Sequence, residues 1–108
     1  MADDKQLPER IVRELLSLQS ETAGVDFKRG FDGSKKAKGE LINCLRAFAN
    51  SKDGGYIVFG VAEKDGKFVP EGLLSSEIAA LDTTKIADLA SKYCSELPQF
   101  TVHRIELE

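Results

Sequence analysis

Apolar residues recur at helical spacing in three stretches of the chain. Pro8 suits the first turn of a helix, and the stripe that follows it predicts a helix from Pro8 to about Gln19. A second stripe predicts a helix over residues 36–50. A third predicts a helix over residues 82–97, which Pro98 stops. Each stripe has polar residues on the opposite face, so each helix can cover one side of a core.

Between these helices the pattern changes to that of strands. The alternation in "VDFK" predicts a short strand at residues 25–28, and the almost wholly apolar residues 55–63 predict a buried one. The "DG" pair at 65–66 predicts a hairpin turn that returns the chain as a strand over 68–70. Alternation over 100–107 predicts a last strand.

The resulting order is α-β-α-β-β-α-β, and residues 75–82 can add a helical turn. This order predicts a small single α+β domain, with a mixed or largely antiparallel sheet packed with about three helices. The last strand pattern has no stop signal, so we expect the chain to be a fragment of a longer protein.

Composition narrows the possible functions. The chain has 108 residues, of which 42% are hydrophobic, so it can bury a core. Its net charge of −3 argues against a protein that coats nucleic acid non-specifically. No apolar run is long enough to cross a bilayer and no signal peptide is visible, so we expect a cytoplasmic protein that does not enter membranes. Cys44 and Cys94 are expected to be core thiols, because no zinc-ligand spacing is present.

Positive charge is concentrated in residues 28–38, where the only acid is Asp32. These cations could contact phosphates, or they could simply be a solvated loop and helix start. Cations near a helix N-terminus oppose the helix dipole, and this misfit favours a role in binding anions. The candidate phosphate-binding residues are Lys28, Arg29, Lys35, Lys36, Lys38 and Arg46.

The turn "NSKDGG" at 50–55 follows the second helix. Gly54 and Gly55 can serve only as a helix cap and tight turn, or they can let backbone N–H groups face an anion beside Asn50. The chain lacks GxxxxGK[ST], so ATP hydrolysis has no support. With His103 as the single histidine, a Ser-His-Asp or Cys-His arrangement is excluded.

Three carboxylates could converge at strand ends. Glu21, Asp26 and one of Glu63 or Asp65 could hold one or two divalent metals and activate water for phosphodiester cleavage. The alternative is that these residues serve as a cap, a solvent-facing strand residue and a turn residue. Spacing alone favours the alternative.

These segments resemble a known family. The chain is similar to the Schlafen/AlbA-type DNA-binding domain in two segments, "VDFK" after Glu21 and "LRAFANSKDGGYIVFGVAEKDGK". The family pattern is an E-F-K strand, A-F-A-N, a G-G turn and an apolar strand ending in G-V. The resemblance covers roughly residues 21–100, so we expect residues 1–20 to form an N-terminal helix and residues 21–108 to form the Schlafen/AlbA-like domain.

The resemblance implies function as well as fold. Bacterial and archaeal members stand at the N-terminus of transcriptional regulators, many of them labelled ATP-binding, and the vertebrate Schlafen core cleaves RNA with three acids. By motif position those acids would be Glu21, Asp26 and Glu63, although Asp26 replaces a glutamate and Ala62 precedes Glu63 where an aspartate is usual. These departures favour binding over cleavage.

Three hypotheses follow from the sequence. The leading one is a nucleic-acid-binding module, of DNA or RNA, that needs no cofactor and has the Asn50–Gly55 turn beside its cations. The second is an endoribonuclease that needs Mg²⁺ or Mn²⁺. The third is an assembly domain that forms homo-oligomers through the C-terminal strand.

Overall fold

The computed structural model describes residues 6–19, 24–96 and 98–106. Its elements, in chain order, are α1 (Gln6–Leu18), β1 (Val25–Lys28), α2 (Lys35–Ala49), β2 (Tyr56–Phe59), β3 (Val61–Lys64), β4 (Lys67–Pro70), α3 (Ser75–Ala80) and α4 (Thr83–Tyr93). The chain is a small α+β protein, as predicted. The three predicted helices are present, and residues 75–80 form a fourth, short one.

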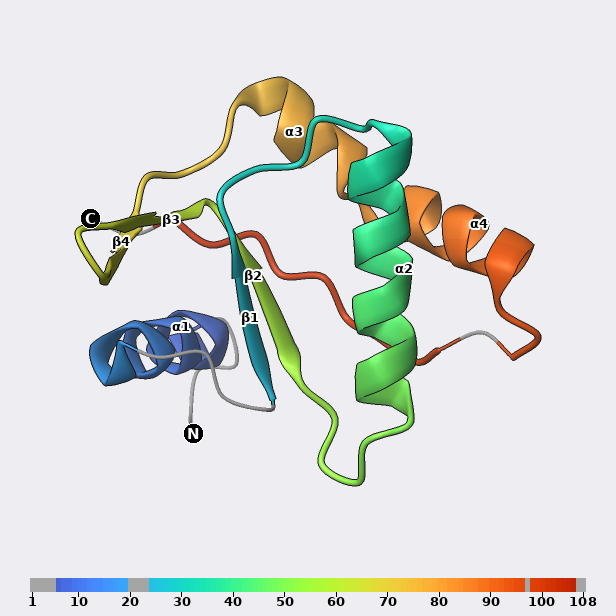
Figure 1. Cartoon of the computed structure of the whole chain (residues 1–108), viewed down its shortest axis with the longest axis horizontal. Coiled ribbons are helices and arrows are strands. Elements are labelled where there is room, and N and C mark those ends of the chain that lie inside the picture. The colour runs from blue at the N-terminus through green and yellow to red at the C-terminus, as the bar shows by residue number, and fades with distance from the viewer. Residues whose placement is uncertain (1–5, 20–23, 97, 107–108) are drawn as a thin grey trace.

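A parallel pair of strands, β1 and β2, stands at the centre of the fold, with α1 on one side and α2 on the other (Figure 1). Val25 and Phe27 of β1 are buried with Val61 against the α1 side. On the α2 side, Ile57 and Phe59 of β2 pack against a second buried cluster of Phe31, Leu41, Leu81 and Ile86. Both faces of the pair are therefore covered, as is usual for parallel strands.

Gly60 divides the apolar run that the sequence predicted as one strand. Its φ of 96° is rarely adopted by residues with a side chain, and it turns the chain from β2 into β3. The Gly60 N–H donates to the carbonyl of Lys28 at 2.7 Å, and its own carbonyl accepts from the N–H groups of Glu71 and Gly72. Because of this turn, β2 pairs with β1 and β3 pairs with β4, so the strands form two small sheets instead of one.

The hairpin of β3 and β4 is antiparallel, and Lys64 pairs with Lys67 across the turn. Asp65 and Gly66 both have positive φ, of 53° and 77°, as the predicted two-residue turn requires. Gln19, just after α1, attaches that helix to the hairpin: its side-chain amide donates to the carbonyl of Phe68 at 2.9 Å and accepts from the N–H of Phe68 at 2.7 Å. The amide thus pairs with β4 much as a neighbouring strand would.

The C-terminal segment differs from the prediction. α4 ends at Tyr93, before the predicted limit near Pro98, and residues 98–106 form no strand. Phe100 packs against the Phe31 cluster, so the alternating pattern reflects partial burial and not strand pairing. The described part of the chain therefore offers no C-terminal strand for assembly. No helix within the described residues is long and apolar enough to cross a membrane.

Candidate functional site

The first turn of α2 carries the densest group of predicted phosphate ligands. Ser34 caps this helix, and its hydroxyl accepts from the N–H of Ala37 at 3.1 Å. Asp32 accepts from the N–H of Ser34 at 2.9 Å, and this hydrogen bond lowers the pKa of Asp32. Phe31, only 6% exposed, anchors the preceding loop in the core. The backbone of the helix start is thus held by specific contacts, and its lysines project from a fixed turn.

Lys35, Lys36 and Lys38 are exposed on this turn. Within the residues that the structure describes, none of the three forms an ion pair. Ammonium groups at a helix N-terminus also face the positive end of the helix dipole. Three positive charges are therefore held together on one turn without a neutralising partner, which is the electrostatic condition for attracting an anion.

Arg29 is engaged in a more complex group of charges. Its side chain is 76% exposed and its Nε lies 3.2 Å from Glu71 Oε1, while Lys64 contacts the other oxygen of Glu71. The hydrogen bond from Lys64, together with the charges of Lys64 and Arg29, lowers the pKa of Glu71. Arg29 thus remains accessible, with part of its charge offset by Glu71.

Lys28 is not a free cation. Its Nζ lies 3.0 Å from Asp26 Oδ2 and 3.7 Å from Glu40 Oε2, and its side chain is only 20% exposed. Burial by itself would lower the pKa of Lys28, but the hydrogen bond and charge of Asp26, with Cys44 and Glu40, raise it. Lys28 therefore stays charged and serves to join β1 to α2.

Asp26 is held by the same cluster. The Cys44 thiol donates to Asp26 Oδ2 at 3.1 Å. Burial, followed by the Asp26 carboxylate, raises the pKa of Cys44 to about 11, so Cys44 stays a protonated, unreactive thiol. One oxygen of Asp26 thus already accepts from a thiol and an ammonium group.

Two acids of the predicted metal triad lie within the described residues, on different strands. Asp26 lies on β1 and Glu63 is exposed on β3, while Glu21 lies outside the described residues. Among the described residues, no group of three or more histidine, cysteine or acidic side chains is placed to hold a metal ion. The triad of Glu21, Asp26 and Glu63 therefore stays a prediction.

The structure separates the Asn50–Gly55 turn from the lysines of α2. The turn follows the last residue of the 15-residue helix and the lysines occupy its start, so the two are roughly 20 Å apart at about 1.5 Å per residue. Of the predicted cations, the turn lies beside Arg46, whose carbonyl accepts from the Asn50 N–H at 3.0 Å, and not beside Lys35, Lys36 and Lys38. Asn50 is the C-cap of α2, and any Cβ on Gly55 would overlap the ring of Phe48. Glycine is therefore needed at position 55 to leave room for the Phe48 ring.

Arg46 has a structural partner. Its guanidinium donates to the carbonyl of Tyr93, the last residue of α4. A cation at the C-terminal end of a helix satisfies a free carbonyl and complements the dipole. Arg46 therefore attaches α2 to α4, at the end of α2 that lies away from Lys35, Lys36 and Lys38.

Glu77 is a positioning residue that the sequence analysis missed. Its two carboxylate oxygens accept from the N–H of Leu74 at 2.9 Å and from the N–H of Phe31 at 2.8 Å. These two hydrogen bonds lower the pKa of Glu77. One glutamate thus caps α3 and holds the loop before α2. A glutamate two residues into a predicted helical turn was the available signal.

Comparison with known proteins gives one match. Residues 21–108 match the family described as Schlafen, AlbA_2. No curated protein and no solved structure matches the chain.

Proposed function

Because this chain belongs to the Schlafen, AlbA_2 family, we propose that it is a nucleic-acid-binding module of a transcriptional regulator. The family is often associated with such regulators. The first turn of α2 is the surface that contacts the phosphates in this proposal, and Arg29 extends it.

One observation supports this proposal above the others: Lys35, Lys36 and Lys38 are exposed together without an ion-pair partner among the described residues. By contrast, Lys28 and Arg46 make contacts that hold the fold together. Nucleic-acid affinity comes largely from cations that release counterions when they meet phosphates. Cations already neutralised within the protein contribute less to that effect.

The overall charge of −3 limits how the surface can act. Binding must come from a local patch, because the rest of the molecule repels a polyanion. Salt should weaken such binding steeply, with a slope set by the few phosphates contacted.

The test is a salt titration of binding to a labelled nucleic acid for Lys36→Glu and Lys67→Glu. Lys67 is an exposed lysine on β4, so its reversal changes the net charge equally at a distant place. Lys36→Glu should weaken binding roughly three- to tenfold and reduce the slope of log affinity against log salt by about 0.7–0.9. Lys67→Glu should have a much smaller effect. Equal effects of the two variants would show that only net charge matters and would contradict the proposed surface.

A further inference from the structure

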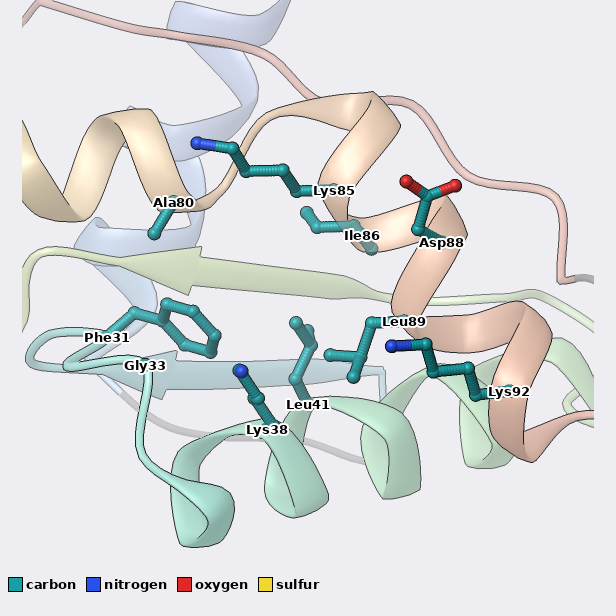
Figure 2. A pocket seen from close by; sticks show the side chains of 10 residues that line it. All are labelled: Phe31, Gly33, Lys38, Leu41, Ala80, Lys85, Ile86, Asp88, Leu89 and Lys92. Carbon is teal, nitrogen blue, oxygen red and sulfur yellow. The ribbon is translucent and has the colours of Figure 1, made fainter.

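A groove of about 350 Å³ lies between α2 and α4 (Figure 2). Its apolar floor is formed by Leu89 of α4, which is half-buried, above three buried core residues: Leu41 of α2, Ile86 of α4 and Phe31 of the loop before α2. The volume is within the range of about 300–1,000 Å³ that is usual for ligand sites. The groove is thus large enough for a planar ring.

Positive charge surrounds this apolar floor. Lys38 of α2 and Lys92 of α4 extend their ammonium groups over the groove from opposite walls, whereas the carboxylate of Asp88 points away from it (Figure 2). Within the described residues neither Lys38 nor Lys92 forms an ion pair. Lys85, also on the lining, donates to the carbonyl of Ala79 at 2.9 Å and is therefore partly engaged.

This combination selects a ligand with an apolar, flat part and a negative charge on either side. A small inorganic anion would leave the floor unused. A duplex presents phosphates but keeps its bases stacked inside. A single strand offers both parts, since an unstacked base can contact an apolar surface while its neighbouring phosphates meet cations.

We propose that the groove between α2 and α4 binds single-stranded nucleic acid, with one unstacked base against Leu89 and the adjoining phosphates on Lys38 and Lys92. This inference rests on the proposed function, because Lys38 belongs to both the groove and the lysine cluster of α2. It adds Lys92, which the sequence did not indicate, and it makes the module selective for unpaired strands.

The experiment compares three labelled ligands of equal length: a thymidine strand, the same strand with abasic sites, and a duplex. Wild-type protein should bind the thymidine strand about tenfold more tightly than the duplex. The abasic strand keeps every phosphate and should bind about five- to a hundredfold more weakly, as expected for the loss of one base contact. Lys92→Glu should weaken binding of the thymidine strand about tenfold, and Lys67→Glu should change it little.

The outcomes separate this inference from the proposed function. If the abasic strand binds as tightly as the thymidine strand, or if Lys92→Glu behaves like Lys67→Glu, the groove does not hold a base. The proposed function would survive that result provided that Lys36→Glu still weakens binding. If wild-type protein binds none of the three ligands, both proposals fail. If an acidic, leucine-rich peptide binds in a Lys92-dependent manner while the strand does not, the groove belongs to a protein partner.

Discussion

Gly60→Ala tests the backbone turn that divides β2 from β3. At a φ of 96° an alanine is outside its preferred regions, which costs about 1–2 kcal/mol. The new Cβ would lie 3.2 Å from the backbone of Gly72, and this crowding costs about 1–3 kcal/mol. Alanine also lowers the conformational entropy of the unfolded chain, which stabilises the folded state by about 0.5 kcal/mol. The free energy of unfolding should therefore fall by about 1.5–4.5 kcal/mol, a large part of the 5–15 kcal/mol typical of a domain.

Gly66→Ala is the matched control for this variant. Gly66 has a φ of 77°, but a Cβ there would meet nothing within 4 Å, so only the backbone cost of about 1 kcal/mol applies. Urea unfolding followed by circular dichroism measures both variants. The close approach of position 60 to Gly72 is refuted as a cause if the free energy of unfolding of Gly60→Ala lies within about 0.5 kcal/mol of the wild-type value, or if it equals that of Gly66→Ala.

Three other perturbations test the contacts around the site. Gln19→Ala removes both the donor to the Phe68 carbonyl and the acceptor of the Phe68 N–H. It should lower the free energy of unfolding by about 1–2 kcal/mol and speed amide exchange at Phe68; unchanged exchange would contradict the link between α1 and β4. Asp26→Ala leaves the half-buried Lys28 without its closest partner and should lower the free energy of unfolding by about 1–3 kcal/mol. Binding of the thymidine strand should stay unchanged; weaker binding at equal stability would instead assign Asp26 to the site. The pKa of Glu77 is lowered in the folded state. The contribution of this carboxylate to folding stability is therefore present above the ordinary pKa of 4.5 and is lost as the pH falls through the lowered, folded-state pKa. The gap in melting temperature between wild type and Glu77→Gln should therefore be largest above pH 4.5 and close in more acidic buffer; a constant gap would contradict this role.

Much of the local structure could be predicted because its causes are local. The helical stripes, the strand at residues 25–28 and the Asp65-Gly66 turn depend on periodicity and on backbone preferences within a few residues. The break at Gly60 was missed because an apolar run looks the same whether it continues straight or turns. A strand at residues 100–107 was predicted wrongly, since alternation shows partial burial but cannot show whether a partner strand is present.

The candidate site was predictable only as a list of residues. The clustering of positive charge in residues 28–38 is visible in the sequence, and so is the family pattern. Which of these cations are free is not visible, because Lys28 meets Asp26 and Glu40 only when β1 lies against α2. Arg46 likewise finds the carbonyl of Tyr93 only because α2 packs beside α4.

The sequence by itself determined the three longer helices, the strand at residues 25–28, the sharp hairpin turn and the concentration of positive charge in residues 28–38, because each depends on residues that are neighbours along the chain. The tertiary structure alone decided how those charges are used. Packing paired Lys28 with Asp26, placed the Asn50–Gly55 turn at the far end of α2 from Lys35, and brought Lys38 and Lys92 to opposite walls of one groove. Contacts between residues far apart in the chain depend on the packing of whole helices and strands, and no local pattern encodes them.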